Sequence, residues 1–298
     1  FLLWHQQSYL VFYAYFFLCI LCKISVMSDF FNGKIVIITG ASSGIGKALA
    51  YRLSELGAIA VIASRSAEKL KIVAEDLKSA GRKVLAITAD VSKEEECRRL
   101  VETTVQTFGG IDILINNAGI SMKALFSEVD LTVLKRLMDV NFWGTVYCSK
   151  YALPYLIERK GSLVGVSSVA GYQGLPGRSG YSASKFAMHG LLESIRIENR
   201  KKKLHVMIFA PAFTASEIRK HALLADGKEQ GESPRREEKL DSPEYVAIQI
   251  IKGIRNRRRN QILSVEGKLT VLLKRLMPGL VDWGYYREFA KEPNSILK

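Results

Sequence analysis

The chain is poor in cysteine and proline, with four cysteines and seven prolines among 298 residues. The cysteines have no regular spacing, which excludes the disulfide framework of a small secreted domain. Cys19 and Cys22 form a C-x-x-C pair, but the pair lies in an apolar stretch with no second pair, so we expect no metal site. No Pro/Ser/Gly-rich linker and no internal repeat divides the chain. These absences favour a single large domain in a reducing compartment.

Negative charge is scarce relative to positive charge. The chain has 29 acidic and 43 basic residues, a formal net charge of +14. Much of the excess lies late, at residues 201–203, 255–259 and 274–275. A solvated surface, a face for anionic lipid, or attraction of a cofactor's phosphates would each explain it. No nucleic-acid-binding motif accompanies the charge, so we expect no nucleic-acid partner.

The longest apolar run lies at the start of the chain. From Tyr9 to Val26, Lys23 is the only charged residue. Extended to Met27 as a helix, the run would span about 28 Å, just short of the ~30 Å hydrocarbon core of a bilayer. Two interpretations of residues 1–32 remain open. They form a membrane anchor for a catalytic domain in the cytoplasm, or a mis-annotated leader, because the chain lacks an initial Met.

The remaining chain alternates short strands with helices. Apolar runs predict strands at residues 35–39, 60–63, 83–89, 113–115, 163–166, 205–209 and 261–265. Amphipathic stretches between them predict helices. This order predicts a doubly wound α/β fold of the Rossmann type, a mostly parallel sheet with helices on both faces, in one domain over residues 33–265. Ligands should bind beyond the carboxyl ends of its strands.

A glycine-rich loop separates the first predicted strand from the first helix. Glycines allow a tight turn and close approach of the backbone to a pyrophosphate. The helix that follows offers free N–H groups and the positive end of its dipole. We therefore expect a dinucleotide site. The loop residues expected to contact it are Gly40, Ser42, Ser43, Gly44, Ile45 and Gly46.

The end of the second strand indicates which dinucleotide binds. A site for NAD requires an acid there to hold the ribose hydroxyls. This chain instead has Ser64 and Arg65, with no carboxylate before Glu68. A guanidinium pairs well with phosphate oxygens. The segment therefore favours NADP(H).

Tyr181 and Lys185 are four residues apart at the head of a long helical stretch. That spacing places both side chains on one face of a helix. A fixed ammonium beside a phenol is expected to lower the phenol's pKa, which is ~10 when unperturbed. Tyr181 would then donate and accept a proton near neutrality.

Together with other motifs, this pair makes residues 33–265 resemble the short-chain dehydrogenase/reductase superfamily. The motifs are T-G-x-x-x-G-x-G from Thr39, N-N-A-G from Asn116, and Y-x-x-x-K from Tyr181, with Ser168 thirteen residues before Tyr181 and Asn141 in D-V-N. The basic, apolar tail resembles the NADPH-dependent branch of hydroxysteroid dehydrogenases and ketosphinganine reductases.

The resemblance implies a catalytic tetrad of Asn141, Ser168, Tyr181 and Lys185. In the family the tyrosine transfers the proton and the serine hydrogen-bonds the substrate oxygen. The lysine holds the nicotinamide ribose, and the asparagine orders a water in the proton relay. The resemblance implies further cofactor contacts from Asp90, Val91, Asn117, Ala118 and Gly119.

The chain departs from the family pattern after the sixth strand. The family has Pro-Gly there, whereas Pro211 is followed by Ala212. A hydroxyl residue a few positions later contacts the carboxamide in the family. Either Thr214 or Ser216 would serve here.

Two C-terminal segments bear on the substrate. Residues 214–239 are charged and contain glycines, as expected of a substrate lid. Residues 266–298 form a basic, apolar extension. It packs on the domain or on another subunit, or it dips into the surface of a membrane.

The most consistent function is an oxidoreductase that transfers a hydride between NADP(H) and a hydrophobic ketone or secondary alcohol, a lipid-like carbonyl compound. The alternative is a non-catalytic NADPH-binding scaffold or sensor. Helices at 131–159 and 181–201 pair across a two-fold axis in the family, which implies a homodimer or homotetramer.

Overall fold

The structure is a computed structural model that describes residues 29–215, 217–231, 240–291 and 295–297. Apart from residues 29–32, the N-terminal segment with its two interpretations lies outside the described residues. Among the residues described, no helix is both long and apolar enough to cross a membrane.

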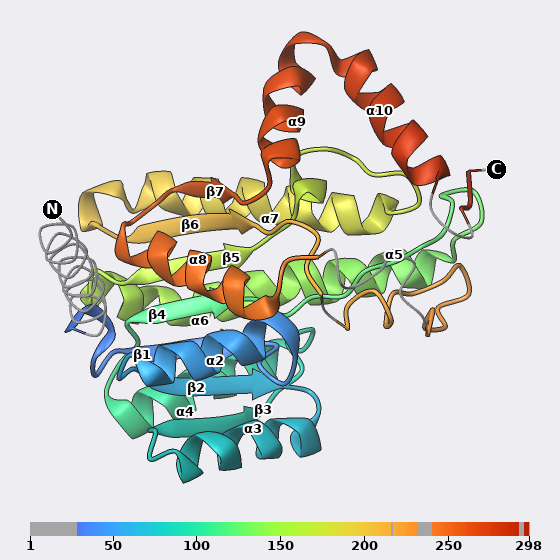
Figure 1. Cartoon of the computed structure of the whole chain (residues 1–298). Coiled ribbons are helices and arrows are strands. Elements are labelled where there is room, and N and C mark those ends of the chain that lie inside the picture. The colour runs from blue at the N-terminus through green and yellow to red at the C-terminus, as the bar shows by residue number, and fades with distance from the viewer. Residues whose placement is uncertain (1–28, 216, 232–239, 292–294, 298) are drawn as a thin grey trace, which may run out of the picture.

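The described part of the chain contains one sheet of seven parallel strands (Figure 1). The strands are β1 (Ile35–Thr39), β2 (Ile59–Ser64), β3 (Val84–Thr88), β4 (Ile113–Asn116), β5 (Ser162–Val166), β6 (His205–Ala210) and β7 (Asn260–Ile262). Their order in space is β3-β2-β1-β4-β5-β6-β7. The order reverses between β1 and β4, and such a switch point leaves a crevice beyond the carboxyl ends of the strands.

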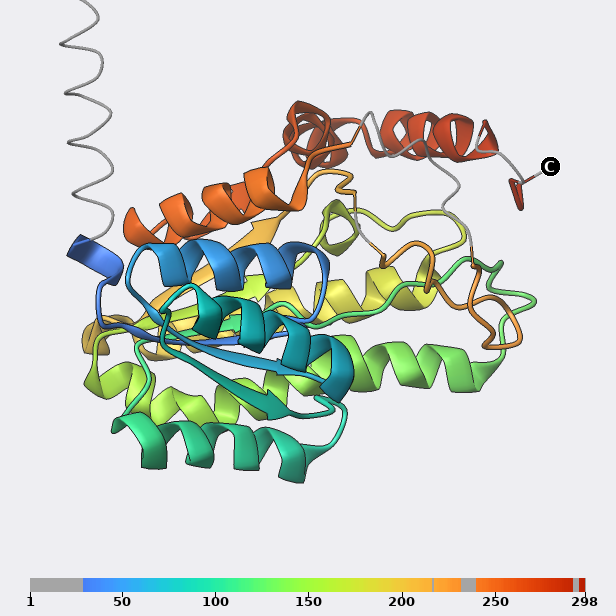
Figure 2. The ribbon, with the colours of Figure 1, turned by 60° about the horizontal axis from the view of Figure 1, so that its bottom comes forward.

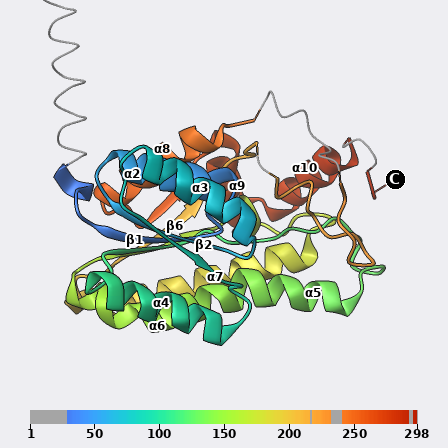
Figure 3. The ribbon, with the colours of Figure 1, turned by 90° about the horizontal axis from the view of Figure 1, so that it is seen from below.

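Helices cover both faces of this sheet. They are α2 (Gly44–Glu55), α3 (Ala67–Ser79), α4 (Glu94–Phe108), α5 (Leu131–Met138), α6 (Gly144–Glu158), α7 (Ser179–Glu198) and α8 (Pro243–Arg255). Figure 3 shows α2, α3 and α8 on one face, and α4 to α7 on the other. The expected doubly wound fold in a single domain is therefore confirmed.

The strands are apolar on both sides because both sides are covered. In β1, Val36 and Ile38 pack in the core beneath α2, α3 and α8, whereas Ile35 and Ile37 pack in the core beneath α4, α6 and α7. None of the four is more than 3% exposed. Burial on both faces explains why the strands are continuous apolar runs. A strand with one face in water would instead alternate apolar and polar residues.

Two elements differ from the expectation. The last strand ends at Ile262 rather than at residue 265, because the Ser264 side chain accepts a hydrogen bond from Gly267 N (3.0 Å) and caps a helix that begins at Val265. The stretch 131–159 is not one regular helix. A π-helical segment, Asp139–Trp143, separates α5 from α6.

The C-terminal extension forms two helices, α9 (Val265–Leu276) and α10 (Pro278–Ala290). They rise from the domain as an inverted V (Figure 1), on the side of the sheet away from α4 (Figure 2). Gln173 Nε2 donates to Asp282 Oδ1 (3.0 Å), and Lys274 Nζ donates to Tyr172 O (2.6 Å). The inner side of the extension therefore packs on this chain's own domain.

A buried neutral histidine begins β6. His205 Nε2 lies 2.8 Å from Arg258 O, so this nitrogen carries the hydrogen, and Nδ1 accepts from Ser162 Oγ at 2.9 Å. Burial lowers the pKa of His205 to about 4, and the cations Arg257 and Arg196 act in the same direction, while the bond to Arg258 opposes them.

This histidine should make the fold sensitive to acid. An unfolded histidine takes up a proton near pH 6.5, but folded His205 does so only near pH 4. The free energy of unfolding should be undiminished above pH 6.5 and fall as the pH drops toward 4, by roughly 3 kcal/mol from this residue. Denaturant unfolding across that range, in the wild type and in His205→Gln, measures the effect. The variant should lose roughly 3 kcal/mol less on acidification, and an equal loss in both proteins would contradict the assignment.

Candidate active site

A cavity of about 680 Å³ lies beyond the carboxyl ends of the strands, where the switch point places it. It is lined by segments that follow each of the strands β1 to β6, and by residues of α7 and α10. Most of the residues expected from the sequence meet there. They are Gly40, Ser42, Ser43, Gly44, Ile45, Ser64, Arg65, Val91, Asn117, Ala118, Gly119, Ser168, Tyr181, Lys185, Pro211 and Thr214.

Three expected residues lie behind the cavity wall instead. Gly46 and Asp90 are not among the lining residues, and Asn141 is fully buried. Ser216 lies outside the described residues. Thr214 lines the cavity, and its Oγ1 donates to Ala212 O (3.0 Å). The choice between Thr214 and Ser216 for the carboxamide contact stays open.

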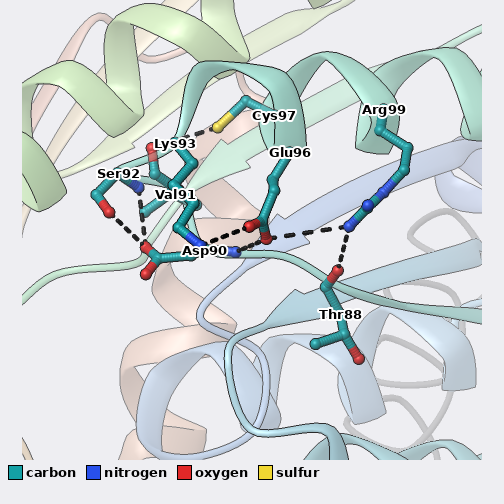
Figure 4. Close-up of polar contacts among 8 residues, drawn as sticks. All are labelled: Thr88, Asp90, Val91, Ser92, Lys93, Glu96, Cys97 and Arg99. Carbon is teal, nitrogen blue, oxygen red and sulfur yellow. Dashed lines mark hydrogen bonds and ion pairs between the residues drawn. The ribbon is translucent and has the colours of Figure 1, made fainter.

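Asp90 builds the turn that places Val91 at the cavity (Figure 4). Its Oδ1 accepts hydrogen bonds from Ser92 N (3.0 Å) and Ser92 Oγ (2.8 Å), and its backbone N donates to Glu96 Oε2 (2.8 Å). That backbone hydrogen bond is the main reason why the pKa of the Glu96 carboxyl is lowered, and Lys93 adds to it. Asp90 Oδ1 is therefore engaged by Ser92, and the Asp90 backbone is tied to Glu96 in the first turn of α4.

The glycine loop packs directly against the segment that follows β4. Asn117 Nδ2 donates to Thr39 O (2.9 Å) and to Gly40 O (3.2 Å), while Thr39 Oγ1 accepts from the backbone N of Asn117 and of Ala118 (both 3.0 Å). Gly40 has a φ of +66°, and a Cβ there would lie 2.9 Å from Ala118 Cα. Only glycine permits this backbone conformation and this contact.

The N-terminus of α2 fits a phosphate group. Ser43 is the N-cap residue, but its side chain makes no capping hydrogen bond, and the first turn contains no acidic residue. Ser42, Ser43 and Gly44 line the cavity. The positive end of the helix dipole therefore faces the cavity without a carboxylate to neutralise it.

Cations gather at the end of β2. Arg65 is exposed at the cavity edge, and Lys69 Nζ lies 3.3 Å from Glu217 Oε2. Ser66 Oγ accepts from Lys69 N (3.3 Å) as the N-cap of α3, and Ser64 Oγ donates to Ser66 O (3.2 Å). β2 itself brings no carboxylate to this edge, which favours a phosphate over a ribose hydroxyl as the bound group.

Tyr181 and Lys185 project from the first turns of α7 into the cavity. Lys185 Nζ donates to Val166 O (3.0 Å) and lies 5.8 Å from the centre of the Tyr181 ring. Tyr181 also hydrogen-bonds Ser168, which follows β5. The three side chains are therefore held together by one helix and one strand end.

The pKa of Tyr181 differs from the expectation. Burial raises it above 10, although the hydrogen bond to Ser168 and the charge of Arg178 act to lower it. Burial also lowers the pKa of Lys185 to about 8. Attraction between the phenolate and the ammonium would lower the pKa of Tyr181. Removal from water disfavours the charged form of both groups, and for Tyr181 this effect is the larger.

Asn141 joins α7, which carries Tyr181 and Lys185, to the segment that follows β4. Its Oδ1 accepts from Ile120 N (2.8 Å), and its Nδ2 donates to Ile120 O (3.0 Å) and to Ser184 Oγ (2.9 Å). It lies in the π-helical segment Asp139–Trp143. Such insertions are frequent at functional sites.

His189 supports the other side of the site. It lies one helical turn after Lys185, and its Nε2 is 2.6 Å from Ser167 Oγ. Burial lowers its pKa to about 4, and Lys185 and Arg196 add to this, so His189 is neutral. The bond fixes Ser167, which precedes Ser168.

Sequence reasoning missed several residues on the substrate side. Leu175, Arg178 and Phe289 line the cavity, and the Arg178 guanidinium lies 5.9 Å from the centre of the Phe289 ring. Phe289 belongs to α10, more than a hundred positions beyond Tyr181, so no local pattern could place it here. The extension therefore completes the cavity wall.

The segment expected to act as a lid is partly built into the domain. Leu223 N donates to Ser121 O (2.9 Å), and Lys123 N donates to Leu223 O (2.8 Å). Phe213, Ile218 and Leu223 add apolar surface to the cavity. Residues 232–239 of the segment lie outside the described residues.

A substitution at Gly46 tests whether the close packing of the glycine loop is needed for nucleotide binding. An added Cβ would lie 2.2 Å from Gly40 O and 2.5 Å from Asn117 Nδ2, so the loop must shift. Gly46→Ala should reduce nucleotide affinity at least tenfold in titration calorimetry, because the backbone donors move. The control is Gly190→Ala on α7, where a Cβ meets nothing within 4 Å. Equal nucleotide affinity in the two variants would contradict the role given to the loop.

Comparisons with known proteins agree with this site. The profile of the family described as short chain dehydrogenase matches residues 34–226. The 11-beta-hydroxysteroid dehydrogenase 1A of Arabidopsis thaliana is 36% identical over 271 residues, which cover 87% of this chain and 76% of that protein.

Two solved structures share the architecture. A short chain dehydrogenase/reductase from Burkholderia phymatum in complex with NAD has a TM-score of 0.74 and 26% identity, covering 84% of this chain and 95% of that one. An alcohol dehydrogenase from the archaeon Thermococcus sibiricus, complexed with 5-hydroxy-NADP, has a TM-score of 0.69 and 23% identity, covering 78% and 95%. A profile match over most of the catalytic domain, with a relative this similar along most of its length, shows that the chain belongs to the short-chain dehydrogenase/reductase family of oxidoreductases.

Proposed function

We propose that this protein is an NADP(H)-dependent oxidoreductase that interconverts a hydrophobic ketone and a secondary alcohol. The observation that carries the proposal is that Tyr181, Ser168 and Lys185 line the same cavity as the glycine loop and the N-terminus of α2. A protein that only bound the nucleotide would need no buried phenol beside an ammonium. This argues against the non-catalytic scaffold or sensor.

In the reductive direction Tyr181 donates its phenolic proton to the oxygen of the former carbonyl group. Because its pKa is raised, the phenol keeps this proton at neutral pH, as an acid must. Ser168, hydrogen-bonded to Tyr181, holds the same substrate oxygen. The bound nicotinamide supplies the hydride.

Lys185 stabilises the phenolate that remains after proton transfer. With a pKa of about 8, its amine is mostly protonated at neutral pH. Its position is set by the hydrogen bond to Val166 O, and its remaining N–H groups would hold the ribose of a bound nicotinamide nucleotide. The ordering of a relay water by Asn141 stays a prediction from the resemblance.

The preference for NADP(H) rests on this chain's own residues. The two similar structures hold NAD and 5-hydroxy-NADP respectively, so the shared fold leaves the choice open. Arg65 and Lys69 stand at the cavity edge beside Ser64. In the proposal Arg65 pairs with the 2′-phosphate in a forked geometry, and Lys69 leaves Glu217 to contribute a second positive charge.

The substrate side of the cavity favours an apolar compound. Leu175, Phe213, Leu223 and Phe289 line it. Such surfaces bind an apolar skeleton by removing it from water. The name of the Arabidopsis thaliana relative, a hydroxysteroid dehydrogenase, fits a lipid-like carbonyl compound.

Assembly and location stay predictions. We retain the homodimer or homotetramer expected through α5, α6 and α7. Phe186 on α7 (40% exposed) and Trp143 in the π-helical segment between α5 and α6 (43%) offer apolar contact area there. The anchor or leader at residues 1–32, and with it the cytoplasmic placement of the domain, is also retained as a prediction.

The proton donor is tested by Tyr181→Phe. Loss of the acid should lower kcat roughly 10²- to 10⁴-fold, or further, while NADPH binding persists. Single-turnover NADPH oxidation measured with a panel of apolar ketones checks this. The control is Tyr155→Phe, which removes a hydroxyl from a tyrosine on α6 outside the cavity lining. Near-normal turnover in Tyr181→Phe would overturn the mechanism.

The cofactor preference is tested by Arg65→Asp. The change replaces a phosphate partner with an acceptor for ribose hydroxyls. Loss of a charge-assisted pair costs ~2 kcal/mol or more, so NADPH affinity should fall about thirtyfold or more while NADH affinity rises. Arg82→Asp makes the same charge change on an exposed residue outside the cavity and serves as the control. If NADPH affinity in Arg65→Asp equals that of the control, another residue recognises the phosphate.

A further inference from the structure

The outer side of α9 and α10 exposes a continuous apolar surface. On α9, Val265, Leu269, Leu272 and Leu276 recur at helical spacing along one face and are 51–78% exposed. The turn and α10 continue the surface, and their members are 47–56% exposed. We call the eight residues together the hairpin face: Val265, Leu269, Leu272, Leu276, Met277, Leu280, Trp283 and Tyr286.

The inner side of the same two helices is what attaches them to the domain. Lys274 Nζ lies 4.9 Å from the centre of the Phe186 ring on α7, and Phe289 is 6% exposed. Thr270 Oγ1, 3.0 Å from Tyr285 OH, joins α9 to α10 on the same side. The hairpin face therefore contributes nothing to these attachments. Large apolar side chains gathered on an exposed surface mark an interaction site.

The charges around the hairpin face are mainly positive. Exposed Lys268 and Arg275 flank the apolar stripe on α9, and the Arg287 guanidinium lies 5.1 Å from the centre of the Trp283 ring. Lys291 follows α10, and the exposed acids are Glu266, Asp282 and Glu288. Among the described residues of the extension, four exposed cations against three exposed acids leave a net positive charge.

We propose that the hairpin face docks on an anionic lipid bilayer, with α9 and α10 lying in the headgroup region. An apolar helix face flanked by cations, with Trp and Tyr at the boundary, is the pattern of an interfacial helix. A second copy of this chain fits less well. A two-fold contact would bring one cationic rim against its own copy, and like charges oppose such a contact.

This inference goes beyond the proposed reaction, because it rests on the outer side of the extension alone. It also sets how the extension is oriented between the bilayer and the cavity. The helix that carries Trp283 and Tyr286 toward lipid carries Phe289 to the cavity wall. An apolar compound dissolved in the bilayer would thus be held close to the cavity.

Hydroxyl-radical footprinting of the full chain tests the docking residue by residue. The probes are vesicles of dimyristoyl phosphatidylcholine alone or mixed with dimyristoyl phosphatidylglycerol. With the anionic vesicles, labelling of Met277, Trp283 and Tyr286 should fall at least threefold. Labelling of Tyr245 on α8 and of Phe126, which are exposed at 45% and 71%, should not change. Because each residue is followed separately, attachment through any other part of the chain does not produce this result.

Three results would overturn the proposal. The first is unchanged labelling of the hairpin face in protein that has been captured on anionic vesicles. The second is protection that rises with protein concentration in the absence of vesicles, which would identify a second copy as the partner. The third is equal protection by the two kinds of vesicle, which would remove the role given to charge.

A pair of double variants gives an independent test. Leu272→Glu with Leu276→Glu places two acids on the hairpin face, and vesicle-dependent protection of Met277 and Trp283 should be lost. Ile72→Glu with Phe126→Glu makes the same change at exposed apolar residues of α3 and of the turn that precedes α5, and the protection should persist. All four side chains are more than half exposed, so both variants should keep the wild-type melting temperature. Equal protection in the two variants would refute the docking surface.

Discussion

The contact between the ends of β1 and β4 is the constraint on which the rest of the site depends. The two strands are hydrogen-bonded neighbours. The chain leaves β1 for α2 on one face of the sheet and leaves β4 for α5 on the other, which opens the crevice between the two connections (Figure 3). Thr39 and Asn117 join them by hydrogen bonds between side chain and backbone. The contact is so close that a Cβ at Gly46 would lie 2.2 Å from Gly40 O. The N-terminus of α2 reaches the cavity because small residues permit this approach.

The same crevice sets the electrostatics of the reacting groups. Tyr181 and Lys185 leave water together, and burial favours the neutral form of each. A phenol that keeps its proton suits the proposed donation to a substrate oxygen. The phenolate left by that donation would be stabilised by fixed partners, Ser168 and the Lys185 ammonium, which is the main form of Lys185 at neutral pH. Neutral His189 adds no competing charge beside Lys185.

Local patterns allowed the fold and most of the cavity wall to be predicted from the sequence. The glycine loop, the Tyr181–Lys185 pair and the apolar strands each depend on neighbours within a few positions, and the structure brings them together as expected. The failures involve contacts that are distant in sequence. The residues around Asn141 do not predict a π-helical turn, and those around Phe289 do not predict that α10 returns to the cavity. The direction of the Tyr181 pKa shift was also missed, because spacing conveys charge proximity but not burial.

The two sides of α9 and α10 face different surroundings, and the sequence of the extension reflects both. Residues that point inward are held by single, specific partners, such as Lys274 by Tyr172 O and Asp282 by Gln173. Residues that point outward are large, apolar and flanked by cations. Packing on the domain would require only the first set, and water would favour polar residues in place of the second. A surface that is apolar yet cationic at its rim is most stable where apolar chains and anionic groups lie within a few ångströms of each other. The headgroup boundary of a bilayer provides that combination. The apolar substrate proposed for the cavity would also partition into the bilayer, so the outer side and the cavity would serve the same class of molecule.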